Sequence, residues 1–96
     1  MKRISWNLEK AYALSLDADR NHVGFEDCVI AIESGNILDV IANPSPNFRH
    51  QRMLILNINN YAYVVPYVEN DQEYFLKTVF PSRKHTAIYL KDKSND

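Results

Sequence analysis

The sequence predicts an α+β fold in which two N-terminal helices pack on a three- or four-stranded antiparallel meander sheet, followed by a short C-terminal helix. Two patterns carry this prediction. Apolar side chains recur at helical spacing between residues 8 and 34, and aromatic and β-branched residues dominate residues 52–80, where two turn sequences interrupt them. A chain of 96 residues can bury one modest core without disulfides or metals, so we expect residues 1–96 to form a single domain.

The charge is nearly balanced overall but unevenly distributed. A net charge of −1 argues against a protein that holds nucleic acid by bulk electrostatics alone. Residues 1–47 contain four Lys/Arg and seven Asp/Glu, a net charge of −3, whereas residues 48–96 contain seven and five, a net charge of +2. The composition therefore excludes a strongly basic binding protein but leaves room for a local basic patch in the second half.

Cysteine usage and hydropathy indicate the compartment. Cys28 is the single cysteine, which excludes an internal disulfide and a zinc site of several cysteines and suits a reducing compartment. No apolar run reaches the length of a membrane span or of a signal-peptide core. We therefore expect a cytoplasmic protein with no membrane partner. Neither a metal-ligand spacing nor a phosphate-cradling glycine loop is present, and we expect no metal and no cofactor.

The first helix is predicted to begin after Asn7, a residue type that caps helix N-termini, and to run to about Asp19. Leu8, Tyr12 and Leu16 recur at four-residue spacing. This spacing places the three side chains on one face of a helix, and we expect that face to pack on the sheet.

The second helix is predicted over Phe25 to Ser34, with acidic residues in its first turn and Gly35 just past its end. Its apolar arc contains Cys28. We therefore interpret Cys28 as a small buried apolar residue rather than a reactive thiol.

Several short segments connect the main elements. Residues 2–6 fit a small edge strand or an N-terminal arm, and residues 37–41 fit either a strand or a single helical turn. Residues 43–51 contain two prolines and read as a loop. We expect the polar tail, residues 91–96, to be frayed.

The sheet has the clearest signal. Arg52 to Ile58 and Tyr61 to Val68 flank Asn59-Asn60, a two-residue loop whose residues tolerate positive φ, and Asn70-Asp71 leads into a third strand, Glu73 to Phe80. Counting from the turns gives a register and two faces. The face expected to pack on the helices comprises Leu54, Leu56, Ile58, Tyr61, Tyr63, Val65, Tyr67, Tyr74, Leu76 and Phe80. The mixed face comprises Met53, Ile55, Asn57, Ala62, Val64, Pro66, Val68, Glu73, Phe75, Lys77 and Val79.

Two prolines bear on this sheet. Pro66 falls in the expected central strand, where it removes a ladder hydrogen bond, so the strand either bulges there or loses its pairing early. Pro81 is predicted to end the last strand. Ser82 is then a natural N-cap for a final short helix, Arg83 to Leu90.

The junction between the last strand and this helix carries the tightest cluster of groups able to hold a phosphate. The cluster comprises Lys77, Arg83, Lys84 and His85. Taken without any other signal, Arg83 and Lys84 near a helix start are better explained as a solvated helix face than as a site.

The order of elements resembles that of small bacterial ribonuclease toxins of the RelE type, and most closely the BrnT family. Trp6 to Lys10 is similar to the aromatic residue and Asn-led helix that open such chains. His22 to Asp27 is similar to their second helix start, and Ser82 to His85 to their Ser-Arg-Lys turn into the last helix. Together these motifs span nearly the whole chain.

The resemblance implies the toxin of a type II toxin–antitoxin pair, a metal-independent ribonuclease that inhibits translation. The resemblance implies two partners, a cognate antitoxin protein and RNA, with ribosome-associated RNA as one form of that substrate. Such cleavage needs a base for the 2′-hydroxyl, cations for the phosphorane-like charge and an acid for the leaving oxygen. The catalytic candidates are Arg83, Lys84, His85 and Lys77. The candidates for RNA binding are His50, Arg49, Tyr63 and Tyr89.

Other interpretations of the same residues stay open. The alternating tyrosines fit core packing as well as base stacking. His50 lies in a loop, where a histidine is more often a surface residue than a catalyst. The near-neutral charge also fits a degenerate toxin, a non-catalytic interaction module on the same fold. Its docking surface would be the mixed sheet face at Phe75, Met53, Val64 and Ile55.

Overall fold

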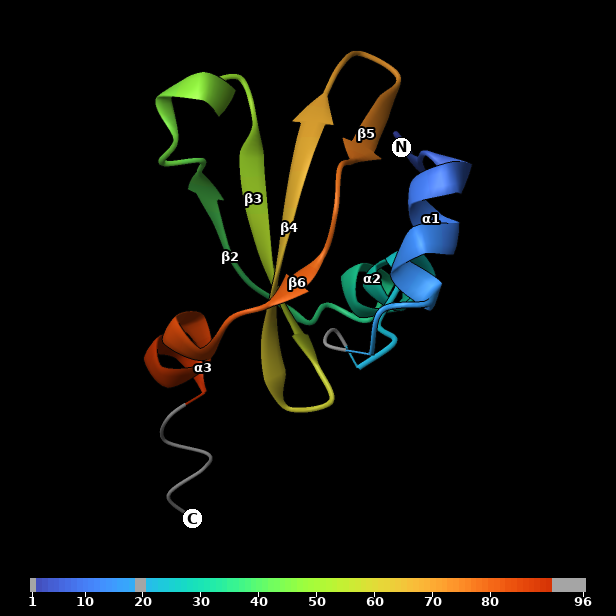
Figure 1. Cartoon of the computed structure of the whole chain (residues 1–96). Helices are drawn as coiled ribbons and strands as arrows, with labels where there is room; N and C mark the ends of the chain where they lie inside the picture. The colour runs from blue at the N-terminus through green and yellow to red at the C-terminus, as the bar shows by residue number, and fades with distance from the viewer. Residues whose placement is uncertain (1, 19–20, 91–96) are drawn as a thin grey trace.

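A computed structural model describes residues 2–18 and 21–90, and within them six strands form one mixed sheet flanked by helices (Figure 1). The elements in chain order are β1 (Arg3–Trp6), α1 (Leu8–Ser15), α2 (Phe25–Glu33), β2 (Ile37–Ala42), the 3-10 helix η2 (Pro46–Phe48), β3 (Arg52–Ile58), β4 (Tyr61–Glu69), β5 (Glu73–Leu76), β6 (Phe80–Pro81) and α3 (Arg83–Tyr89). The α+β class is confirmed. The first helix ends at Ser15, with Leu16 as its C-cap, so its expected end near Asp19 is wrong. The expected frayed tail lies outside the described residues.

The predicted β3–β4 hairpin is confirmed. Asn59 and Asn60 have φ values of 57° and 63° and form its two-residue loop. Asparagine tolerates this left-handed region better than most residues because its short side chain can hydrogen-bond locally. The register then runs without a shift from Ile58 opposite Tyr61 to Arg52 opposite Tyr67.

The predicted arrangement of the sheet is wrong in its extent and in one strand direction. Antiparallel β3, β4 and β5 are present, but the strand order is β1-β5-β4-β3-β2, with β6 beside β4. The segment predicted as an edge strand or an arm is β1, which pairs parallel with β5 from Arg3 opposite Glu73 to Trp6 opposite Leu76. Trp6 also stacks on Phe25 of α2, with ring centroids 5.5 Å apart. This contact between distant segments could not be read from local patterns.

Residues 37–41, for which the sequence fitted either a strand or a single helical turn, belong to strand β2. It pairs antiparallel with β3 and forms the second edge of the sheet. Its register shifts between Ile37 and Asp39, which marks a bulge at the start of the strand.

Pro66 ends one ladder and leaves the other intact. On the β3 side it lies opposite Met53 with no register shift. On the β5 side its carbonyl accepts a hydrogen bond from the Lys77 amide at 2.8 Å, and regular pairing with β5 ends there. Pairing resumes at β6, where Phe80 rather than Val79 lies opposite Val64. Proline has no N–H to donate, so the interruption falls where a ladder bond is missing.

This one-residue step reverses the predicted faces of two side chains. Val79 is fully buried in the cluster that packs on the helices, whereas Phe80 packs on the cluster of the opposite face. Pro81, expected to stop the strand, is instead part of β6 opposite Tyr63. The other apolar side chains of β3, β4 and β5 lie on the faces predicted for them.

The apolar stripe that was predicted to pack the first helix on the sheet faces away from it, so this prediction is wrong. Leu8, Tyr12 and Leu16 are 80%, 69% and 66% exposed. Helix α1 packs instead through Leu14, which is buried, with Ala11 beside it. Helical spacing shows that three side chains share a face, but it does not show which face meets the sheet.

Helix α2 packs through Phe25, Cys28 and Ala31, all buried against the same face of the sheet as α1 (Figure 1). Cys28 is therefore buried as predicted, whereas Ile30 of the same helix is 62% exposed. Burial is the main cause that raises the pKa of the Cys28 thiol to about 12. A thiol that stays protonated and inaccessible fits the predicted packing role. None of the helices among the described residues is long and apolar enough to cross a membrane.

Candidate functional site

Helix α3 lies on the sheet face opposite α1 and α2 (Figure 1). Two hydrogen bonds to Ala62 of β4 and two within its own first turn fix the start of the helix. The Thr86 hydroxyl accepts the Ala62 amide at 2.9 Å and donates to the Ser82 carbonyl at 2.8 Å. The Ser82 amide donates to the Ala62 carbonyl at 2.9 Å. Ser82 is also the N-cap, as predicted, since its Oγ accepts from the His85 amide at 3.1 Å.

The end of α3 is anchored on the edge strand β2. The Tyr89 hydroxyl donates a hydrogen bond to Oδ2 of Asp39, and Oδ1 of Asp39 accepts the Val40 amide at 2.8 Å. The bond from Tyr89, followed by that from Val40, lowers the pKa of the Asp39 carboxyl. The same bond to Asp39 raises the pKa of Tyr89. The two side chains therefore stabilise each other in the protonation states that they hold near neutral pH.

Beneath α3 lies the second core cluster, which comprises Met53, Ile55, Ala62 and Val64 with Leu38, Ile41, Phe80 and Tyr89 packed against it. The docking surface expected on the mixed sheet face is therefore wrong for three of its four members. Met53, Ile55 and Val64 are buried. Phe75 is half-buried on β5 and is not a member of this cluster.

His85 is the best-positioned proton carrier on this face. Its Nδ1 lies 2.7 Å from Ser82 Oγ, and its ring stacks nearly parallel to Tyr89, with centroids 6.3 Å apart and an interplanar angle of 6°. These contacts orient the imidazole through one nitrogen and one ring face. Within residues 2–18 and 21–90, Nε2 has no hydrogen-bond partner, so it is the nitrogen left for a ligand.

Two cations adjoin this histidine in the first turn of α3, and a third, Lys77, lies on the same side of the sheet but farther along it. Arg83 and Lys84 form the exposed first turn of α3, and neither is in an ion pair with another described residue. Lys77 is exposed, with Nζ 5.3 Å from the centroid of the Phe75 ring. The strand register settles the face on which Lys77 lies, because the Lys77 amide bonds Pro66, and Pro66 pairs with Met53 of the cluster on the α3 side. The four catalytic candidates therefore share one face, but Lys77 is level with Met53, roughly 13 Å along the strand from Asn57, where α3 is anchored.

The RNA-binding candidates are not brought together. Tyr63 is 2% exposed, its hydroxyl accepts a hydrogen bond from Asn21 Nδ2 at 3.1 Å, and its ring contacts Tyr61 edge to face. It is a core residue, so the predicted stacking role is wrong. Tyr89 is half-buried, with one ring face on His85 and its hydroxyl on Asp39.

Arg49 and His50 are exposed and lie beside the start of β3, at the opposite end of this strand from α3. Helix α3 is anchored at Ala62, opposite Asn57, five residues beyond Arg52. At about 3.3 Å per strand residue, this separation is roughly 17 Å.

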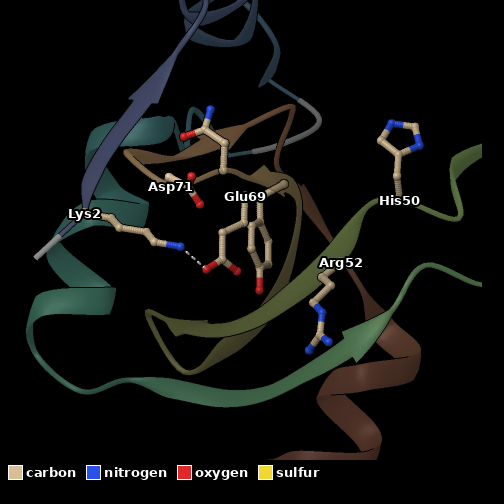
Figure 2. Close-up of a pocket in the computed structure, with 7 residues that line it drawn as sticks. Lys2, His50, Arg52, Glu69 and Asp71 are labelled. Atoms are coloured by element: carbon tan, nitrogen blue, oxygen red, sulfur yellow. Dashed lines mark hydrogen bonds and ion pairs between the residues drawn. The ribbon is translucent and has the colours of Figure 1, made fainter.

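His50 lines a pocket of about 350 Å³ at that end of the sheet, with Lys2, Arg52, Tyr67, Glu69, Asn70 and Asp71 (Figure 2). Lys2 points to Glu69 and forms an ion pair with it, as the dashed line in Figure 2 marks. The hydrogen bond to Glu69 is the main cause that raises the pKa of Lys2. The pocket therefore mixes both signs of charge, and His50 is separated from the catalytic candidates.

Two residues of this site were not predicted as functional, Thr86 and Asp39, which hold α3 in place. Ser82 was predicted as the N-cap and also orients the imidazole, and Phe75, predicted as part of a docking surface, offers an aromatic ring beside Lys77. The spacing of Thr86 four residues after Ser82 was a local signal that could have identified it. The contact of Asp39 with Tyr89, 50 residues apart, had none.

Within the described part of the chain, no group of three or more His, Cys, Asp and Glu side chains is placed to hold a metal ion. Comparisons with family models, with curated proteins and with solved structures found no match. The similarity to the BrnT family therefore remains a prediction from the residues that carry it.

Proposed function

We propose that this chain is the toxin of a toxin–antitoxin pair and cleaves single-stranded RNA in the cytoplasm, with an antitoxin protein as its inhibitor. One observation supports the proposal above the others. The imidazole of His85 is oriented by Ser82, and its Nε2 has no hydrogen-bond partner among the described residues. Arg83 and Lys84 of the same helical turn have no ion-pair partner there either, and Lys77 lies on the same face farther along the sheet. A positioned proton carrier beside such cations is what cleavage of a phosphodiester requires.

In the proposed reaction, the 2′-oxygen attacks the adjacent phosphorus and the bond from phosphorus to the 5′-oxygen breaks. Nε2 of neutral His85 takes the proton of the 2′-hydroxyl, and water protonates the departing 5′-oxygen. The products are a 2′,3′-cyclic phosphate and a 5′-hydroxyl. Ser82 supports this role because a hydroxyl oxygen has two lone pairs and can accept both the His85 amide and an Nδ1–H. That tautomer leaves the Nε2 lone pair free to act as the base.

The cations stabilise the charge that develops on the phosphorane oxygens. Arg83 can hold two of these oxygens with its planar fork, and Lys84 adds a point charge. Lys77 lies farther along the sheet beside the Phe75 ring, where it can contact the phosphate of an adjacent nucleotide. Removing one donor of this kind from an enzyme typically costs about 10²–10³ in kcat.

Phe75 replaces Tyr63 as the residue proposed to stack on an RNA base. Its ring is half-buried on β5, outside the cluster that α3 covers, and Lys77 Nζ lies over it. A base stacked there would have the Lys77 ammonium within reach of its phosphate. Stacking of this kind contributes about 1–3 kcal/mol per base.

Expression of the chain in bacteria tests this proposal. We expect growth arrest and loss of mRNA, both relieved by Arg83→Ala and by His85→Gln. Arg49→Ala and His50→Gln are matched controls because they remove the same side-chain types at the far end of β3. Relief by the two controls with no relief by Arg83→Ala would contradict the proposed site, and unimpaired growth at high expression would contradict the toxin.

A second candidate is a non-catalytic interaction module on the same fold. The exposed apolar stripe of α1 favours it, because Leu8, Tyr12 and Leu16 are mostly exposed. A chain that forms a stable complex with its host partner but cleaves no RNA, alone or after release, would identify this function.

A further inference from the structure

The outer face of α1 carries three large apolar side chains in a row. Leu8, Tyr12 and Leu16 lie one turn apart, span about 12 Å at 1.5 Å per residue, and are 66–80% exposed. Single exposed apolar residues are ordinary, but a contiguous stripe on one helix face marks an interaction surface.

The stripe points away from the core because of how α1 packs. Leu14 is the buried anchor, and it lies about 160° around the helix from both Tyr12 and Leu16. Rotating α1 to bury the stripe would expose Leu14 and break its contact with the cluster that contains Phe25 and Cys28. The stripe is therefore a fixed outward feature of the fold.

The two N-terminal helices are acidic. The described residues from 7 to 35 contain five Asp/Glu and one Lys, a net charge of −4. Glu9 adjoins the stripe on α1. On the exposed face of α2, Glu26 and Glu33 flank Ile30, which is 62% exposed. Both helices cover the same side of the sheet (Figure 1).

The spacing of the stripe and the charge of the two helices indicate which kind of partner would bind here. An apolar ridge of one-turn spacing fits the apolar stripe of another helix, since helices pack through such rows. A second copy of this chain would bring two acidic helix layers together, and like charges across an interface cost several kcal/mol. We propose that the outer face of α1 binds an amphipathic helix of another protein, whose apolar stripe is flanked by Lys and Arg. This inference does not depend on RNA cleavage.

An NMR titration of the labelled chain tests the proposal. The probe is a synthetic helical peptide of about 18 residues with leucines at four-residue spacing and lysines on both flanks, which is long enough to hold a helix. The matched peptide has glutamates in place of the lysines. We expect the lysine peptide to bind at least about tenfold more tightly, with shifts confined to α1 and α2, and more weakly as salt is raised.

Two variants locate the binding surface. The triple variant Leu8→Gln, Tyr12→Gln, Leu16→Gln changes exposed side chains only, so it should fold normally and lose the peptide. The control Ile88→Gln changes a 59% exposed apolar residue of α3, which lies on the opposite side of the sheet, and this variant should still bind the peptide. Equal affinity for both peptides, or shifts centred on α3, would overturn the proposal. So would a dimer of the chain alone, seen by ultracentrifugation and abolished by the triple variant, because the occupant would then be a second copy.

Discussion

The Thr86 hydroxyl joins helix to sheet by accepting the amide proton of Ala62 at 2.9 Å, where β4 has lost its regular neighbour. The amide lies beneath α3 in a fully buried residue. Without the hydroxyl, this N–H would lack a partner in the interior. One side chain of the helix therefore completes the hydrogen bonding of the strand, and the position of the catalytic candidates depends on it.

Thr86→Val keeps the shape of the side chain but removes this acceptor. We expect the free energy of unfolding to fall by about 1–3 kcal/mol, the cost of an unsatisfied buried amide. Urea unfolding measures the loss, and hydrogen exchange should show the Ala62 amide exchanging faster. Thr78→Val is the matched control, because the buried Thr78 hydroxyl has no hydrogen-bond partner among the described residues. Its replacement should leave stability unchanged or raise it, and an equal loss in both variants would contradict the role given to Thr86.

The bond between Tyr89 and Asp39 makes stability depend on pH at both extremes. The lowered pKa of Asp39 gives stability that is present above the ordinary carboxyl value of 3.8 and lost as pH falls through the lowered pKa. The raised pKa of Tyr89 gives stability that is present below the ordinary value of 10.0 and lost as pH rises through the raised pKa.

Tyr89→Phe removes this bond. Urea unfolding over a pH series should show a difference from the unmodified chain that is constant near neutral pH and shrinks at both extremes. Tyr12→Phe, at an exposed tyrosine, should show no difference at any pH. A Tyr89→Phe difference that does not vary with pH would mean that the ring, and not the hydroxyl, anchors α3.

Cys28 should be inert while the protein is folded. Its burial and its pKa of about 12 leave almost no accessible thiolate at neutral pH. We expect a thiol reagent to modify it only as fast as the chain unfolds, and modification to become immediate in denaturant. Cys28→Ser should destabilise the fold by about 1–3 kcal/mol, because it buries a hydroxyl in an apolar cluster. Rapid modification in native buffer would contradict the described packing of α2.

The hairpin loop can be tested through its backbone. Asn60 has a φ of 63°, so Asn60→Gly should stabilise the protein slightly or leave it unchanged. Asn60→Val should lower the free energy of unfolding by about 1–3 kcal/mol, because a β-branched residue is strained there. Urea unfolding of the two variants checks the order. Equal stabilities would mean that the loop does not hold this conformation in solution.

The local elements were predictable, whereas their long-range relations were not. Turn residues and alternation predicted the β3–β4 hairpin and its faces, and Ser82 predicted the start of α3. The parallel pairing of β1 depends on contacts between Trp6 and α2 that no local pattern contains. The sequence showed that Pro66 lacks an N–H donor. Its effect is a one-residue step in the register that exchanges the sheet faces of Val79 and Phe80, and this effect could be seen only from the pairing with β5 and β6.

The candidate site shows the same division. The cluster from Arg83 to His85 was predicted from the chain, as was Lys77. Its geometry depends on Asp39 and Ala62, which tie α3 to two strands. Tyr63 was misassigned because an alternating tyrosine fits a buried face and an exposed face equally well, and only packing decides between them.

Cleavage of an end-labelled single-stranded RNA by the purified chain tests the central claim most directly. We expect products with 2′,3′-cyclic phosphate and 5′-hydroxyl ends, and we expect His85→Gln to lower the cleavage rate by about 10²–10⁴, the usual contribution of a general base. His50→Gln should cleave at the unmodified rate. A His85→Gln protein that cleaves as fast as the unmodified chain, or an unmodified chain that leaves the RNA intact, would contradict this account.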